Sequence, residues 1–193
     1  MNDKFAIDPK TTALLVMDFQ TWIVDGYAVD KEALLKRTAR VIQAARNAQV
    51  MVIYVVVGFR VGYPEVSSRN MTFSKVKEHS LFVAGGDGLE IHPAIAPRPG
   101  EVVVTKHRVS AFAGTDLDMI LRANGIETLL LTGITTSGVV LSTVRYAFDA
   151  DYRLVVVADC CSELDDHVRR TLIEEIFTQQ AAVVTSRDVV AGL

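Results

Sequence analysis

Short runs of apolar residues alternate along the chain with longer stretches in which apolar positions recur every three or four residues. The short runs are typical of strands buried on both faces, and the longer stretches of amphipathic helices. This pattern predicts strands over residues 13–17, 50–57, 101–105, 128–132, 153–158 and 182–185, and helices over residues 31–48, 115–124, 137–151 and 166–178. Such alternation predicts a three-layer, doubly wound α/β fold with a mostly parallel sheet and helices on both faces.

Residues 58–100 interrupt this alternation and hold four of the five prolines. We expect this segment to be long and irregular, with little regular structure. In a compact domain such a segment is usually a lid, a binding loop or an oligomer contact. No repeat or linker divides the chain, so a single domain over residues 1–193 is expected.

Composition narrows the class of protein. The chain has 193 residues, of which 50% are hydrophobic, with a formal net charge of −3. The excess of acidic residues argues against a nucleic-acid or anionic-membrane surface, and no apolar run reaches the roughly 18–20 residues of a membrane span. The first residues, MNDKFAIDPK, lack the layout of a signal peptide, so a cytoplasmic location is expected.

Cysteine and histidine positions give no support for a metal site or a structural disulfide. Cys160 and Cys161 are adjacent, where a disulfide would be strained, which fits a reducing compartment. The four histidines show no close ligand spacing, and the GGDG segment does not join a strand to a helix as a phosphate loop does. The sequence therefore predicts neither a metal nor a cofactor.

Two ionisable residues stand at the carboxyl ends of predicted strands, where ligands collect in an open parallel sheet. Asp18 follows residues 13–17, and Lys106 follows residues 101–105. Burial of Asp18 would raise its pKa and suit it to proton transfer, while a nearby lysine would hold the carboxylate and attract an anionic substrate. Alternatively, Asp18 caps the next turn and Lys106 is a surface charge.

Several stretches together resemble the isochorismatase-like hydrolase superfamily. They are LLVMDFQ, KHRVSAF, the TGITTSGVV turn and VVVADCCS with a histidine after it, and the similarity runs from about residue 11 to 185. The resemblance implies a six-stranded parallel sheet in the order 3-2-1-4-5-6. Most members are cysteine hydrolases that act on small amides with an Asp–Lys–Cys triad, and Asp18 and Lys106 match the first two members of that triad.

The third member of the triad is missing. In the cysteine enzymes the turn resembles TG-x-x-T-x-x-C, and counting from Thr132 places Val139 at the cysteine position. A valine side chain cannot act as a nucleophile, so an acyl-enzyme route through this position is closed.

Three hypotheses for a site that lacks the catalytic cysteine remain open. In the first, hydrolysis proceeds without covalent catalysis, as in the isochorismatases, which also lack the cysteine. Their KWRYSAF resembles KHRVSAF here, and the resemblance implies that Asp18 is a general acid that protonates a vinyl ether before water adds. This chain departs from them in the turn, where GITTS replaces an aromatic residue and a histidine, and in Val139, which narrows a position usually occupied by a small residue.

In the second reading another nucleophile substitutes, with Cys160 or Cys161 at the end of the neighbouring strand a better candidate than Ser137 or Ser142. Ser137 is better explained as an N-cap. In the third reading the protein is a catalytically inactive small-molecule-binding or interaction module of the same fold.

Further residues are candidates for shaping the pocket or contacting a substrate. The resemblance implies a cis peptide at Ile134–Thr135 that orients backbone donors at Thr135 and Val139. The remaining candidates are two arginines for a substrate carboxylate, two aromatic walls and the residues of the turn: Arg60, Arg108, Phe19, Phe112, Thr135, Thr136, Ser137 and Gly138. The arginines could equally form loop salt bridges, and the aromatic rings could be plain core. A homo-oligomer, either a dimer or a tetramer, is expected, as is usual in the superfamily.

Overall fold

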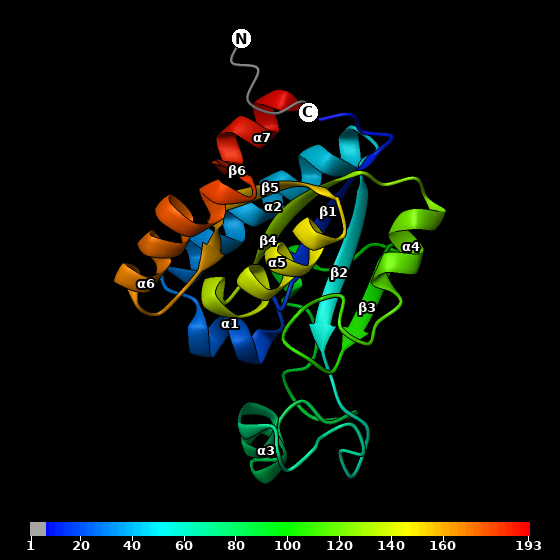
Figure 1. Ribbon diagram of the computed structural model, residues 1–193, viewed down its shortest axis with the longest axis vertical. Helices are drawn as coiled ribbons and strands as arrows, with labels where there is room; N and C mark the ends of the chain where they lie inside the picture. The colour runs from blue at the N-terminus through cyan, green and yellow to red at the C-terminus, as the bar shows by residue number, and fades with distance from the viewer. Residues whose placement is uncertain (1–6) are drawn as a thin grey trace.

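A computed structural model describes residues 7–193 and contains one six-stranded parallel sheet (Figure 1). The strand order β3-β2-β1-β4-β5-β6 confirms the expected architecture and topology. The strands are β1 (Thr12–Met17), β2 (Met51–Val57), β3 (Val102–Lys106), β4 (Thr128–Ile134), β5 (Arg153–Ser162) and β6 (Ala182–Val184). The single domain was expected from residue 1, and residues 1–6 lie outside the described part of the chain, so that expectation stays a prediction.

Each face of the sheet is covered by its own helices because successive strand residues point to opposite sides. Ala13, Leu15 and Met17 of β1 join one hydrophobic cluster, together with residues of α4 (Leu117–Ala123), α5 (Leu141–Asp149), α6 (Asp166–Thr171) and the helical turns η3 (Leu172–Ile176) and η4 (Phe177–Gln179). Leu14 and Val16 join the other cluster, with α1 (Thr21–Tyr27), α2 (Lys31–Asn47) and α7 (Ser186–Gly192). The central strands are therefore buried on both faces, as their apolar runs predict.

Three short helices were not predicted. They are α1, α7 and α3 (Met71–Glu78), of seven or eight residues each, so each offers barely two turns of the periodic pattern. For two of these helices the sequence contains only a capping residue as an indication: Asn70 caps α3, and Thr185 and Asp188 form a capping box at α7. The expectation of little regular structure in residues 58–100 was therefore wrong for the part that forms α3, which is followed by the 3₁₀ turn η1 (Pro93–Ile95).

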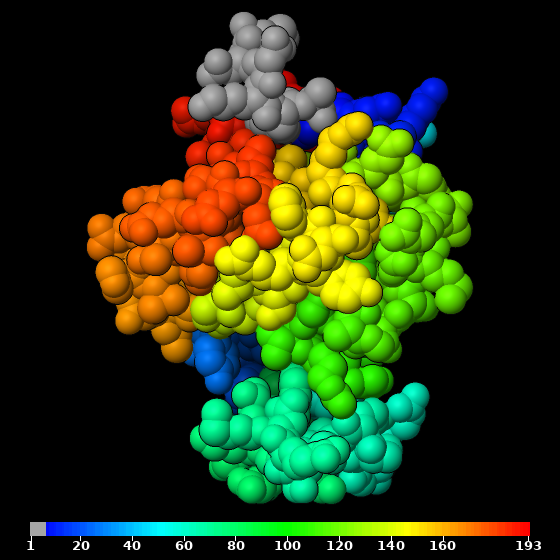
Figure 2. All heavy atoms as spheres, in the orientation of Figure 1, coloured from blue at the N-terminus to red at the C-terminus, as the bar shows by residue number. Residues whose placement is uncertain are grey.

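Residues 58–91, called the arm below, project from the carboxyl ends of β2 and β3. Figure 2 shows much of this segment as a lobe that protrudes from one end of the molecule and touches the body above it. Gln20 fixes the arm where it leaves β2. The buried side-chain amide of Gln20 accepts the Val57 N–H and donates to the carbonyls of Val57 and Leu89. Inside the arm, the ring of Phe59 packs against those of Tyr63 and Phe73. The arm is thus a folded unit beside the sheet edge where Asp18 and Lys106 lie.

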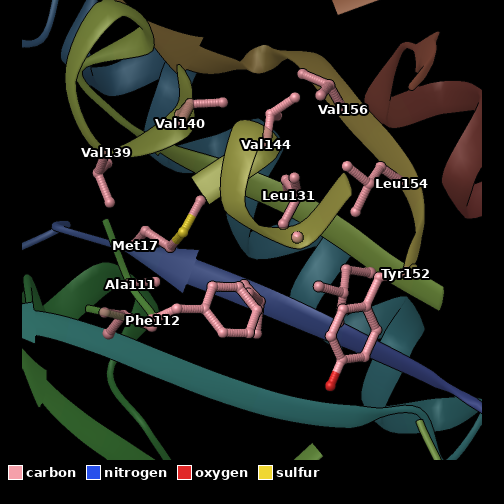
Figure 3. Close-up of a cluster of buried hydrophobic side chains, with 14 of the residues drawn as sticks. Met17, Ala111, Phe112, Leu131, Val139, Val140, Val144, Tyr152, Leu154 and Val156 are labelled. Atoms are coloured by element: carbon pink, nitrogen blue, oxygen red, sulfur yellow. The ribbon is translucent and has the colours of Figure 1, made fainter. Parts of the chain in front are cut away.

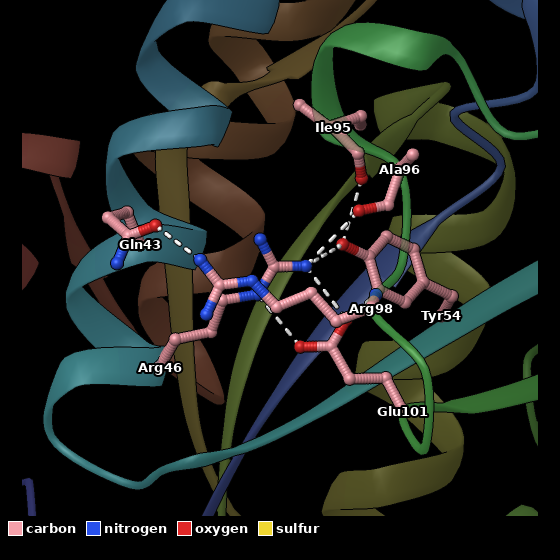
Figure 4. Close-up of polar contacts among 7 residues, drawn as sticks. All are labelled: Gln43, Arg46, Tyr54, Ile95, Ala96, Arg98 and Glu101. Atoms are coloured by element: carbon pink, nitrogen blue, oxygen red, sulfur yellow. Dashed lines mark hydrogen bonds and ion pairs between the residues drawn. The ribbon is translucent and has the colours of Figure 1, made fainter.

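The chain returns from the arm to β3 through an anchored loop (Figure 4). Arg46 of α2 forms a two-pronged ion pair with Glu101, at 2.8 Å from Nε and 2.7 Å from Nη2. The same guanidinium donates to the Tyr54 hydroxyl, and that hydroxyl donates to the Ile95 carbonyl. Paired guanidinium–carboxylate bonds fix orientation as well as distance. The start of β3, and hence the position of Lys106 at its end, is fixed against α2.

Candidate active site

Asp18 and Lys106 face each other across the carboxyl end of the sheet. Lys106 Nζ lies 2.9 Å from Asp18 Oδ2, although β2 separates their strands. Only 6% of Asp18 and 3% of Lys106 is exposed. Alternation in β3 turns Val104 and Lys106 inward and leaves Thr105 exposed, so the lysine is carried into the protein by the strand itself. The alternative reading of Lys106 as a surface charge is wrong.

The backbone at Asp18 explains how its carboxyl group reaches the lysine. Asp18 has φ of 59°, in the left-handed region, which aspartate tolerates better than most residues. Its amide still donates to the Val55 carbonyl, so the strand pairing continues while the side chain leaves the regular alternation. A residue held in this way at the end of a strand is a common feature of functional sites.

One carboxylate oxygen of Asp18 has no hydrogen-bond donor within the described chain. Oδ2 meets Lys106, but Oδ1 is buried and unpartnered. A buried acceptor without a donor is costly, and most such atoms bond a protein group or a bound water. Asp18 Oδ1 is therefore available to a substrate or a water molecule.

Two opposing effects set the protonation of Asp18. Burial raises the pKa of its carboxyl group, and the positive charge of Lys106 and its hydrogen bond lower it again. Burial prevails, so the pKa lies above the ordinary aspartate value. Asp18 consequently holds a proton to higher pH than an exposed aspartate, as a general acid requires.

The turn after β4 lies beside this pair. Met17 pairs with Gly133, so the chain segment that begins at Ile134 emerges next to Asp18. The Ile134–Thr135 peptide is cis, at the place that the resemblance implied. A helix follows, first as the π-helical turn η2 (Thr136–Val140) and then as α5.

Ser137 was expected to be the N-cap of this helix, and that expectation was wrong. The Thr135 hydroxyl accepts the Gly138 N–H at 3.2 Å, so Thr135 is the cap. The hydroxyl of Thr136 instead donates to the Ser162 carbonyl, and the Ser137 N–H donates to Glu163 Oε2 at 2.9 Å. Ser and Thr both suit a cap, and three of them in succession made the choice ambiguous in the sequence.

Val139 is the residue that the resemblance matches with the nucleophile of the cysteine enzymes. Its side chain is 2% exposed and belongs to the same cluster as Met17, Ala111 and Phe112 (Figure 3). Ala111 is held against α5 because its N–H donates to the Thr143 hydroxyl. The position is thus apolar and closely packed, with no group that could attack a substrate.

The other residues predicted to contact a substrate lie on both faces of the sheet and at the arm. Phe112 packs in the cluster of Val139 and stacks on Tyr146, whereas Phe19 lies in the cluster of the opposite face. Arg60 pairs with Glu65 in the arm. Arg108 donates to the carbonyls of His107 and Glu65, and its own carbonyl accepts from Lys106 Nζ at 3.1 Å. Substrate contact by these four residues stays a prediction.

The two cysteines are buried and lie on different faces of the sheet. Cys161 pairs with Gly133 and shares the cluster of Val139, while Cys160 belongs to the opposite cluster. Burial raises the pKa of the Cys160 thiol to about 12 and that of Cys161 even more. A protonated thiol is a poor nucleophile.

One surface hollow lies on the arm side of the sheet edge, and Asp18 and Lys106 are not among the residues that line it. The hollow has a volume of about 540 Å³ and is lined by Gln20, Arg60 and His107 among others. Within residues 7–193, no set of three or more His, Cys, Asp or Glu side chains is placed to hold a metal ion, and no helix is long and apolar enough to cross a membrane.

Sequence reasoning assigned no role to two residues that shape the site. Gln20 ends the stretch LLVMDFQ, but an amide two residues after Asp18 gives no chemical signal of its own. Glu163 follows VVVADCCS and contacts the turn only because β5 extends to Ser162, four residues beyond its predicted end.

Comparison with known proteins decides the family. The model of the isochorismatase domain matches residues 12–188. The chain belongs to the isochorismatase family. It is 32% identical over 178 residues to the ureidoacrylate amidohydrolase RutB of Methylobacterium radiotolerans, a match that covers 81% of this chain and 69% of that protein.

Solved structures agree with this family assignment. A cysteine hydrolase from Pseudomonas syringae pv. phaseolicola superposes with a TM-score of 0.90 at 25% identity, covering 97% of this chain and 94% of that one. N-carbamoylsarcosine amidase from Thermoplasma acidophilum superposes with a TM-score of 0.74 at 31% identity, covering 91% and 96%. Together with the family match, these similarities identify the isochorismatase-family chain as a hydrolase.

Proposed function

We propose that this isochorismatase-family hydrolase cleaves a small anionic molecule by acid–base chemistry of Asp18 and Lys106, without a covalent intermediate. The observation that carries this proposal is the buried ion pair with one unpartnered carboxylate oxygen, next to an apolar residue at the nucleophile position. A carboxyl group with a raised pKa can give and recover a proton during one turnover.

For a vinyl ether, protonated Asp18 would donate its proton to the terminal carbon of the double bond, using the π electrons to form the new C–H bond. The adjacent carbon becomes an oxocarbenium centre, and Asp18 becomes a carboxylate that the Lys106 ammonium stabilises. Water adds to that carbon and returns a proton to Asp18, and the resulting hemiketal breaks its C–O bond to give a ketone and an alcohol. No step needs a protein nucleophile.

Hydrolysis of a C–N bond is the second candidate, because the relatives above include an amidohydrolase and an amidase. Here ionised Asp18 would take a proton from a water molecule while the oxygen of that water molecule attacks the carbonyl carbon. The proton then passes to the nitrogen as the C–N bond breaks. Lys106 would offset the negative charge that builds up at the site.

A substrate screen tests the proposal and separates an enzyme from a binding module. Small vinyl ethers, amides and ureido compounds, each with and without a carboxylate, would be assayed for product formation and for a thermal shift in parallel. We expect carboxylate-bearing compounds of one class to be turned over. Compounds that raise the melting temperature but never react would favour the binding module and overturn the hydrolytic proposal.

The relocated-cysteine alternative makes a separate prediction. Replacing Cys160 and Cys161 by serine should leave turnover within about two-fold of the wild-type rate, since buried thiols with raised pKa values are inert. A thiol alkylator should not inactivate the wild-type enzyme. Stoichiometric inactivation on alkylation of either cysteine would promote that residue to nucleophile.

Assembly and location belong to the same proposal. The projecting arm supports a homo-oligomer, a dimer or a tetramer, in which it packs against another subunit, and equilibrium sedimentation would report its mass. A cytoplasmic location is consistent with two adjacent, unpaired cysteines.

A further inference from the structure

Glu163 is a carboxylate that accepts a backbone N–H of the turn at residues 134–139. It follows directly after β5, whose last residues pair with the end of β4: Gly133 with Cys161 and Ile134 with Ser162. The side chain of Glu163 reaches across from this point, and Oε2 accepts the Ser137 N–H at 2.9 Å. Its other oxygen, Oε1, accepts the Leu164 N–H.

Two consecutive residues of the turn, Thr136 and Ser137, are therefore hydrogen-bonded to Ser162 at the end of β5 and to Glu163 directly after it. The Thr136 hydroxyl donates to the Ser162 carbonyl at 3.0 Å. Ser162 is itself fixed, because its hydroxyl accepts the Val29 N–H in the loop between α1 and α2. These contacts to β5 and its end add to the hydrogen bond that the turn makes within itself, from the Gly138 N–H to the Thr135 hydroxyl.

The charge of Glu163 is not neutralised by an ion pair among residues 7–193. Arg169 of α6 lines the same surface hollow, but it and Arg170 pair with Asp166. Against the turn from the other side stand Asp18 and Lys106, whose charges cancel only while Asp18 is ionised; when Asp18 holds its proton, the Lys106 ammonium remains as a positive charge. The same hollow is lined by Arg37, which pairs with Asp159. Glu163 therefore places a negative charge against the Ser137 N–H.

We propose that Glu163 is a positioning residue that fixes the turn and makes it unfavourable for negative charge. Backbone N–H groups at the start of a helix normally stabilise an anion, and here one of them, the Ser137 N–H, already donates to a protein carboxylate. Resting on the proposed function, this favours substrates whose transition state gains positive charge, such as an enol ether, over amides, whose transition state gains negative charge.

The charge effect can be measured without a substrate by placing a thiol at the vacant position. In a chain with Cys160 and Cys161 replaced by serine, Val139→Cys provides a reporter whose thiolate fraction is read from its ultraviolet absorbance. Adding Glu163→Gln should raise the thiolate-to-thiol ratio at fixed pH roughly 3- to 10-fold, because an anion near a thiol disfavours its ionised form. The matched control is Glu174→Gln, an exposed glutamate on the turn that continues α6. Equal ratios in Glu163→Gln and the control would overturn the charge effect.

The positioning effect has its own readout, amide hydrogen exchange at Ser137 in the wild-type background. Glu163→Ala removes the acceptor and should speed exchange at Ser137 by about 10-fold or more, whereas Glu163→Gln keeps an oxygen acceptor and should stay within about 3-fold. Unchanged protection in Glu163→Ala would show that the turn holds itself. Since neither measurement needs turnover, their failure would count against Glu163 alone, and a failed substrate screen would count against the proposed hydrolysis alone.

Discussion

Asp18→Asn is expected to lower kcat by about 10²- to 10⁴-fold, the usual contribution of a group that both donates and accepts a proton. Asparagine keeps the size of the side chain and an oxygen that can face Lys106, but it has no proton to transfer at the point where Oδ1 is now unpartnered. The measurement is the steady-state rate with whichever compound the screen identifies, together with the melting temperature.

Asp149→Asn is the matched control, because Asp149 is an exposed aspartate at the end of α5. It should leave both kcat and the melting temperature unchanged. If Asp18→Asn turned over substrate at the wild-type rate while remaining folded, the assignment of Asp18 as the acid would have to be abandoned.

Lys106→Met is expected to reduce stability and to change how stability depends on pH. Removing one member of a buried ion pair typically costs about 3–5 kcal/mol at a pH where the remaining group is charged. Methionine keeps an unbranched stem one atom shorter than that of lysine and removes the charge that lowers the pKa of Asp18, so that pKa should rise further.

The direction of the pH effect follows from the raised pKa of Asp18. Because the folded state holds this proton more tightly than the unfolded state, stability is highest below the unfolded-state pKa and falls as the pH rises through the folded-state pKa. Lys106→Met should extend this fall to higher pH, so the variant should lose most stability relative to wild type in the alkaline range.

Urea unfolding across the pH range would measure this effect, with the double variant Asp18→Asn/Lys106→Met as the reference that lacks both charges. The double variant should show none of the extended fall. Parallel stability profiles for wild type and Lys106→Met would mean that the two side chains are not coupled in solution.

Much of the fold was predictable because its signals are local and repeated. The apolar run of β2 predicts a strand, and the recurrence of apolar positions every three or four residues in α2 predicts a helix. Doubly buried strands separated by helices then indicate a parallel sheet. The prediction was weakest for α1, α3 and α7, which are too short to establish a period, and for the end of β5, where Cys160–Ser162 are buried by neighbours distant in the sequence.

The sequence alone determined that an acid and a lysine stand at the ends of strands β1 and β3, and its resemblance to the cysteine hydrolases implied that a valine occupies the nucleophile position. Residue types and their positions along strands are enough for such statements, since the carboxyl ends of parallel strands meet at one edge. Tertiary structure decided the 2.9 Å approach of Lys106 to Asp18, the unpartnered Oδ1 and the contact of Glu163 with Ser137. Those features depend on the direction of individual side chains from segments far apart in the chain, and on backbone geometry at single residues such as Asp18, which no periodic pattern encodes.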